Sequence, residues 1–129
     1  ALFSDDRFRA GQKILHREEG PTLTVAVAES AAGPDGPARR WLYTDSFLVA
    51  GVSPDYAYMR MLGHLPALFH PRPRSVLIVG CGAGVTAGTF VLHPTIERIV
   101  ICDIEPLIPR VVATHFRREN HDVLRDPRV

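Results

Sequence analysis

Long apolar runs, signal-like segments and clusters of basic residues are all missing from this sequence of 129 residues. A helix that crosses a bilayer needs roughly 20 apolar residues, and no run approaches that length. The first residues, 1–5, have neither the charged start nor the apolar middle of a signal peptide. The net charge is +1, and acids are interleaved with the fourteen arginines and the single Lys13. We therefore expect no binding to nucleic acid, which requires clustered cations.

Cysteine is also scarce, since Cys81 and Cys102 are the only two. Two cysteines do not form a disulfide scaffold, so we expect free thiols and a cytoplasmic protein. The six histidines show no H-x-x-x-H or Cys/His spacing, and no metal site is predicted. Nucleophilic hydrolysis has little support either, because the sequence contains no G-x-S-x-G motif.

What the sequence does contain is a change of pattern along its length. Residues 1–52 favour a small antiparallel β-hairpin domain, with strands at 22–28, 40–44 and 47–50 and a weaker candidate at 13–16. Glycine and proline at 31–37 indicate a turn between the first two of these strands. The region 1–52 is therefore expected to be all β.

Residues 53–74 are predicted to form a helix followed by a stiff connector. Ser53-Pro54 is typical of a helix start, and the apolar residues Tyr58, Met61, Leu62 and Leu65 recur at helical spacing. We expect this helix to run from 54 to about 64. The proline-rich stretch 70–74 then leads into the last region.

Residues 75–129 alternate strand and helix, which predicts parallel strands joined by right-handed crossovers. The expected elements are strands at 75–79 and 96–102 and helices at about 84–93 and 106–118. The fold class is therefore α/β, with an antiparallel β segment followed by part of a Rossmann-like sheet. In such sheets a nucleotide cofactor binds at the carboxyl ends of the strands.

A glycine-rich turn follows the first of these parallel strands. Gly80, Gly82 and Gly84 form G-x-G-x-G, which lets a ligand lie against the backbone. Val85 stands where the dinucleotide motif G-x-G-x-x-G has its last glycine, which favours a cofactor of the S-adenosylmethionine type over NAD. A tight turn without a ligand is the alternative interpretation.

An acid ends the second parallel strand. Asp103 lies at a carboxyl end, where its carboxylate can accept hydrogen bonds from ribose hydroxyls. The alternative role for Asp103 is to cap the next helix. Nearby Glu105 is interpreted as an acid in the first turn of that helix, favoured by the helix dipole.

The order of these segments resembles the spermidine synthases, the polyamine aminopropyltransferases. The likeness runs through Tyr58-Met-Arg-Met-Leu-Gly-His64-Leu-Pro66 and His70-Pro-Arg-Pro-Arg-Ser-Val-Leu-Ile-Val-Gly-Cys-Gly-Ala-Gly84. It continues through Leu92-His-Pro-Thr-Ile-Glu-Arg-Ile-Val-Ile-Cys-Asp-Ile-Glu105 and 120–129. The resemblance implies a small β domain before a Rossmann-like, methyltransferase-like domain.

The resemblance also implies a reaction and a set of site residues. The reaction is transfer of an aminopropyl group from decarboxylated S-adenosylmethionine to putrescine, by a homo-oligomer that uses no metal. Gly80, Gly82 and Gly84 would line the nucleoside, and Asp103 would hold the ribose. Tyr58 and His64 match positions that border the substrate pocket. The family's catalytic aspartate lies beyond the Asp-Pro-Arg-Val segment, so the catalytic residue is unknown and the chain is expected to be a truncated, inactive piece.

Two departures from the family keep other functions open. Ala83 stands where the family usually has an acid, and Val49 stands where it usually has a glutamine. The alternatives are a divergent methyltransferase-like protein that binds S-adenosylmethionine and a non-catalytic homologue. Two parallel strands alone are expected to leave one sheet edge and both sheet faces without cover, which favours self-association.

Overall fold

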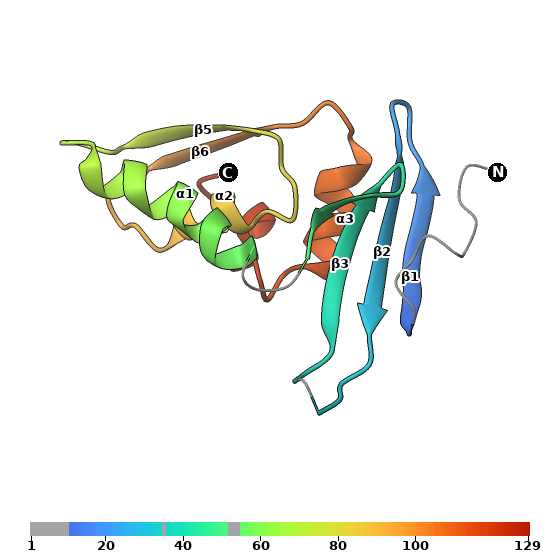
Figure 1. Cartoon of the computed structure of the whole chain (residues 1–129). Helices are drawn as coiled ribbons and strands as arrows, with labels where there is room; N and C mark the ends of the chain where they lie inside the picture. Colours follow the sequence, from blue (N-terminus) through green and yellow to red (C-terminus); the bar gives the residue numbers. More distant parts are fainter. Residues whose placement is uncertain (1–10, 35, 52–54) are drawn as a thin grey trace.

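Two sheets and three α-helices make up the computed structural model, which describes residues 11–34, 36–51 and 55–129 (Figure 1). The elements are β1 (Gln12–Glu19), β2 (Thr24–Ser30), β3 (Arg39–Thr44), β4 (Phe47–Ala50), α1 (Asp55–Phe69), β5 (Ser75–Val79), α2 (Val85–Val91), β6 (Arg98–Cys102), α3 (Leu107–His115) and a 3-10 turn, Val123–Arg125. Strands β1 to β4 form an antiparallel sheet, and β5 and β6 pair in parallel. The predicted fold class is confirmed. None of the described helices is long and apolar enough to cross a membrane.

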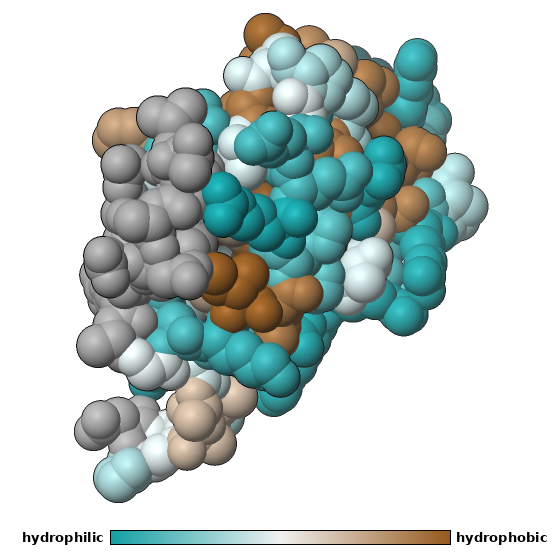
Figure 2. All heavy atoms as spheres, turned by 90° about the vertical axis from the view of Figure 1, so that its right-hand side faces the viewer, coloured by the Kyte–Doolittle hydropathy of each residue, from teal (hydrophilic) through white to brown (hydrophobic). Residues whose placement is uncertain are grey.

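The antiparallel sheet has four strands, whereas the sequence clearly indicated three and gave one weaker candidate. The weak pattern at 13–16 belongs to β1, an eight-residue strand with a bulge between Ile14 and His16. The strand expected at 22–28 begins instead at Thr24, because the amides of Thr22 and Leu23 donate to a carboxylate from another part of the chain. Seen from the β1 side, the described surface is largely hydrophilic (Figure 2).

Helix α1 is longer than predicted and runs through Pro66 to Phe69. A proline inside a helix removes its own amide donor, but the carbonyl of Pro66 still accepts from the amide of His70. The expected start at Ser53-Pro54 lies outside the described residues. Helices α1 and α2 cross closely at Gly63, where a Cβ atom would lie 2.7 Å from Cβ of Thr89.

The parallel part follows the predicted order with shorter elements. Strand β5 has the predicted bounds, 75–79, and pairs in register with β6. Strand β6 begins at Arg98, two residues later than predicted, and its ladder starts where the amide of Arg98 donates to the carbonyl of Arg74 (3.1 Å). Helix α3 ends at His115, since Phe116 leaves helical geometry with φ −120°.

One face of the parallel pair is covered and the other is bare. Val76, Ile78, Ile99 and Ile101 pack with Phe90 of α2 and Ala67 of α1. The expectation that both faces lack cover is therefore wrong on the α2 side. On the opposite face Leu77 and Val79 are 63% and 84% exposed, so apolar surface remains open there.

The antiparallel sheet packs against α3 to form the largest apolar core. Val25, Val27 and Leu42 of the sheet contact a cluster that includes Val111, Val112 and Phe116. All of these side chains are at most 4% exposed. Burial of apolar side chains across this contact joins the two sheets into one structure.

A buried carboxylate crosses the same contact. Glu105 is fully buried, and its Oε2 accepts hydrogen bonds from the Thr22 amide (2.9 Å), the Thr22 hydroxyl (2.6 Å) and the Leu23 amide (3.3 Å). Its Oε1 accepts from the amide of Leu107 at the start of α3 (3.1 Å). Burial raises the pKa of Glu105, but these hydrogen bonds outweigh burial, and the pKa lies below its ordinary value. Glu105 is thus an anchor between the turn after β1 and α3, and it lies before the first turn of α3 instead of within it as the sequence suggested.

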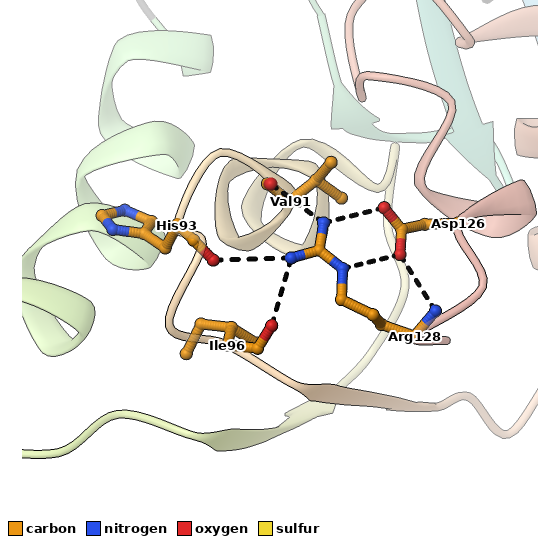
Figure 3. Close-up of polar contacts among 5 residues, drawn as sticks. All are labelled: Val91, His93, Ile96, Asp126 and Arg128. Carbon is orange, nitrogen blue, oxygen red and sulfur yellow. Dashed lines mark hydrogen bonds and ion pairs between the residues drawn. The ribbon is translucent and has the colours of Figure 1, made fainter.

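The last residues are held by a second carboxylate and an arginine (Figure 3). The guanidinium of Arg128 donates to the carbonyls of Val91 (2.9 Å), Ile96 (3.1 Å) and His93 (3.4 Å), and it pairs with both oxygens of Asp126 (2.8 Å each). The backbone carbonyl of Arg128 also accepts from the amide of Ile99 in β6. Arg128 therefore ties the end of α2 and the turn before β6 to the final segment.

Replacing Gly20 tests the anchor. Any Cβ at Gly20 would collide with the Glu105 carboxylate, so we expect Gly20→Ala to lower the free energy of unfolding by about 2 kcal/mol through overpacking. The control is Gly33→Ala, where a Cβ meets nothing within 4 Å and stability should stay within about 0.5 kcal/mol. Urea unfolding measures both variants, and equal stabilities would contradict the anchor.

Acid should weaken the Arg128 contacts. Hydrogen bonds from Arg128 lower the pKa of Asp126 from 3.8 to about 2. Because the folded-state pKa is depressed, this contribution to stability is present above pH about 4 and is lost as the pH falls toward about 2. The stability difference between the wild type and Asp126→Asn should therefore shrink over this window in urea unfolding. A difference that stays constant from pH 5 to pH 2 would show that the ionised carboxylate contributes nothing.

Candidate functional site

The glycine-rich loop, residues 80–84, connects β5 to α2 at the carboxyl end of the parallel pair. Gly80, Gly82 and Gly84 all have positive φ, at 88°, 51° and 77°. Two backbone hydrogen bonds hold the loop. The amide of Gly80 donates to the carbonyl of Cys102 in β6 (2.7 Å), and the amide of Gly84 donates to the carbonyl of Cys81 (2.8 Å). Glycine at these positions therefore follows first from the backbone conformation.

The three glycines differ in what surrounds them. A Cβ at Gly80 or Gly82 would meet nothing within 4 Å, so the loop surface is open at both residues. A Cβ at Gly84 would lie 2.9 Å from Nδ2 of Asn120 and 3.3 Å from Val112. Gly80 and Gly82 thus offer room for a ligand, whereas Gly84 makes room for packing inside the protein.

Asp103 lies directly across from this loop and is half-buried. Its Oδ2 accepts from the amide of Cys81 (2.7 Å) and its Oδ1 from the amide of Glu105 (2.9 Å). It does not cap α3, whose N-cap residue is Pro106. Each carboxylate oxygen accepts up to two hydrogen bonds, so both retain acceptor capacity for a ligand hydroxyl.

A hollow of about 270 Å³ opens beside the loop. Gly80, Gly82, Tyr58 and Val49 are among its lining residues. Tyr58 of α1 is 63% exposed, so it borders the hollow and is not packed in the core. The other described lining residues are Met59, Leu62, Ile78, Val79, Cys81, Ala83, Val85 and Thr86. The described lining is mainly apolar and includes no charged side chain.

A second hollow, of about 230 Å³, lies at the opposite end of β5, lined by residues such as Pro66, His70 and Ser75. It faces the amino end of the strand, away from the glycine loop. Ligands of open α/β sheets bind at the carboxyl ends, so we place the candidate site at the first hollow.

His64 does not line the first hollow. Its Nδ1 lies 2.9 Å from Nε2 of His93, and the two rings meet edge to face with centroids 5.1 Å apart. Burial and the neighbouring His64 lower the pKa of His93. The structure therefore brings Gly80, Gly82, Tyr58 and Asp103 to one edge, and it places His64 in a contact between α1 and the turn after α2.

Cys81 belongs to the loop, and its side chain is buried. Burial, assisted by the Asp103 carboxylate, raises the pKa of the Cys81 thiol to about 12. A thiol with so high a pKa is protonated at neutral pH and is a poor nucleophile. Within the described ranges, no group of three or more His, Cys, Asp or Glu residues is arranged to hold a metal ion.

Two contributors to this region were not identified from the sequence. Asn120 contacts the loop from a turn after α3, and Glu105 fixes the segment that carries Asp103. Their partners lie 37 and 83 residues away in the chain. No local pattern of residues signals such a contact.

Comparisons with known proteins agree on one family. The family model described as the spermine/spermidine synthase domain matches residues 55–129. The polyamine aminopropyltransferase of Clostridium tetani is 32% identical over 89 residues, covering 69% of this chain and 32% of that protein. The polyamine aminopropyltransferase of Desulforudis audaxviator is 33% identical over 112 residues, covering 84% of this chain and 38% of that protein. This chain thus spans about a third of the length of these relatives.

A solved structure shows the same fold. The spermidine synthase of Thermotoga maritima superposes with a TM-score of 0.76 at 22% identity, over 90% of this chain and 38% of that one. A spermidine synthase solved with the transition-state analogue AdoDATO matches with the same score and coverage. The antiparallel sheet, α1 and the parallel pair thus occur together in proteins of this type.

The two cysteines should differ sharply in reactivity. At pH 8 only about one Cys81 thiol in ten thousand is ionised, given its raised pKa, whereas Cys102 is exposed. Iodoacetamide should therefore modify Cys102 at least a hundredfold faster, as measured by peptide mass spectrometry. In urea the two rates should converge. Equal rates in the folded protein would contradict the burial of the Cys81 thiol.

Proposed function

The chain belongs to the spermine/spermidine synthase family, and from this premise we propose that it forms the nucleoside-binding part of an aminopropyltransferase. The observation that carries the proposal is the pairing of an open glycine loop with Asp103 across the carboxyl end of β5 and β6. The resident co-substrate would be decarboxylated S-adenosylmethionine. The free thiols of Cys81 and Cys102 support a cytoplasmic location within this proposal.

The geometry supports a definite arrangement of the nucleoside. The adenosyl group would lie against Gly80 and Gly82, where nothing occupies the space that a side chain would fill. Asp103 would accept hydrogen bonds from the ribose with the acceptor capacity that its two backbone contacts leave. The exposed ring of Tyr58 would close the side of the hollow toward the amine. Gly84, His64 and Asp103 are not among the residues that line the hollow, and Asp103 lies at its edge through its hydrogen bond with the amide of Cys81, a lining residue.

The proposed reaction is a direct displacement at carbon. A neutral amine such as putrescine attacks the methylene group next to the sulfonium, a C–N bond forms, and the C–S bond breaks. The electron pair of the broken bond stays on sulfur, methylthioadenosine leaves, and the product amine loses a proton. Holding the two reactants in line converts a bimolecular step into an effectively unimolecular one, which lowers the barrier. We further propose that the enzyme is a homo-oligomer that acts on small molecules.

The lining of the hollow favours one alternative within the same cofactor class. Its described residues include no carboxylate that would pair with a cationic aminopropyl tail, and Ala83, within the loop, is 1% exposed. The tail of S-adenosylmethionine is zwitterionic and has no net charge, so an uncharged lining disfavours it less than it disfavours a cationic aminopropyl tail. The two functions leave different products, methylthioadenosine and S-adenosylhomocysteine.

These products separate the two functions in a thermal-shift assay. We expect 1 mM methylthioadenosine to raise the melting temperature more than S-adenosylhomocysteine does, because a ligand that binds the folded state stabilises it. Asp103→Asn should weaken the affinity for methylthioadenosine about tenfold, the typical cost of losing a charge-assisted hydrogen bond. The control is Glu97→Gln, which removes an exposed carboxylate far from the loop. A larger shift with S-adenosylhomocysteine favours methyl transfer, and no shift with either ligand contradicts the proposal.

A further inference from the structure

Asn120 is a buried amide in the turn that follows α3, at 1% exposure. Its backbone is fixed on both sides, because its amide donates to the carbonyl of Phe116 (3.0 Å) and its carbonyl accepts from the amide of Val123 (3.2 Å). Both Phe116 and Val123 are fully buried. The side chain of Asn120 therefore extends from a rigid base toward the glycine loop.

The loop and α2 are shaped to receive Asn120. Gly84 has no side chain where Nδ2 of Asn120 lies, since a Cβ there would come within 2.9 Å of that nitrogen. A Cβ at Gly88, one turn later in α2, would collide with the backbone carbonyl of Asn120. Both glycines thus allow the turn that carries Asn120 to reach the base of the loop.

The contact that results is a hydrogen bond to the loop backbone. Nδ2 of Asn120 donates to the carbonyl of Ala83 (3.2 Å), and the amide of the same peptide unit, on Gly84, donates to the carbonyl of Cys81 (2.8 Å). Both polar atoms of the Ala83–Gly84 peptide are therefore held. Rotation of this peptide plane, which would change the positive φ of Gly84, has to break both hydrogen bonds.

The side-chain oxygen of Asn120 makes this arrangement costly for stability. Oδ1 of Asn120 is buried, and no donor among the described residues reaches it. A buried acceptor without a partner destabilises the folded state, and an apolar side chain of the same shape would avoid that cost. The favourable contribution of Asn120 thus comes from its Nδ2 donor, which holds the Ala83 carbonyl of the loop.

We propose that Asn120 is a positioning residue of the nucleoside site, which fixes the Ala83–Gly84 peptide so that Gly80 and Gly82 keep their open, ligand-accepting conformation. The residue does not touch the ligand and acts through the loop. The inference rests on the proposed function, since it assigns a purpose to the shape of a nucleoside-binding loop.

Asn120→Leu is the principal test, because it keeps the side-chain volume and removes both the donor and the unpaired acceptor. We expect the melting temperature to stay the same or rise, while the affinity for methylthioadenosine falls about tenfold in isothermal titration, the scale of one lost hydrogen bond. In the ligand-free protein the NMR amide signals of Gly82 and Gly84 should shift. Ile96→Val is the matched control, because Ile96 is 2% exposed in the separate apolar cluster near the amino end of β5. It should lower the melting temperature and leave both the affinity and these signals unchanged.

A second variant provides a pH readout that simple loss of packing would not give. Asn120→Asp has the shape of the wild type, and its protonated carboxyl can donate to the Ala83 carbonyl whereas the ionised form cannot. The affinity of this variant for methylthioadenosine, relative to the wild type, should therefore rise as the pH is lowered from 7 to 5. If Asn120→Leu does not fold, the pH dependence of the Asn120→Asp affinity tests the proposal by itself. A relative affinity that does not change between pH 7 and pH 5 overturns the proposal.

The remaining outcomes separate this inference from the proposed function. A folded Asn120→Leu with wild-type affinity and unshifted glycine signals overturns the positioning role. If the wild type binds no nucleoside, the proposed function fails, and the NMR signals alone then test the role. Shifted signals of Gly82 and Gly84 in the leucine variant would support it, and unshifted signals would overturn it.

Discussion

The hydrogen bonds of the Glu105 carboxylate hold the rest of the structure in place. One oxygen accepts from Thr22 and Leu23 in the turn after β1, and the other accepts from Leu107 at the start of α3. The contact joins segments 83 residues apart and adds to the apolar packing of the antiparallel sheet against α3. Without it, Asp103, two residues earlier, would lose the fixed segment from which it reaches the glycine loop.

The candidate site follows from that fixed segment. Asp103 bridges the two loops at the carboxyl ends of β5 and β6, because it accepts from Cys81 on one side and Glu105 on the other. Asn120 holds the same loop from a third element. A preorganised loop does not have to be ordered when the ligand binds, which lowers the cost of binding. The open surface at Gly80 and Gly82 is thus supported by buried polar contacts behind it.

Local patterns of residues predicted the parallel part well. The bounds of β5, the glycine turn and the position of Asp103 after β6 all depend on nearby residues, and the structure has them as expected. The continuation of α1 through Pro66 was missed because its packing against α2 outweighs the local effect of proline. The roles of Glu105 and Asn120 were missed because their partners are distant in the chain. Gly84 matched the motif, but its glycine is explained by a positive φ and by the space that Asn120 fills, and not by contact with a ligand.

The proposed nucleoside site lies at the carboxyl edge of β5 and β6. Chemical-shift mapping of the ¹⁵N-labelled chain during titration with methylthioadenosine tests this claim most directly. We expect saturable shifts at the amides of Gly80, Gly82 and Asp103 and near Tyr58, with the amino end of β5 unaffected. Shifts concentrated around His70 and Ser75, at the opposite hollow, would contradict it.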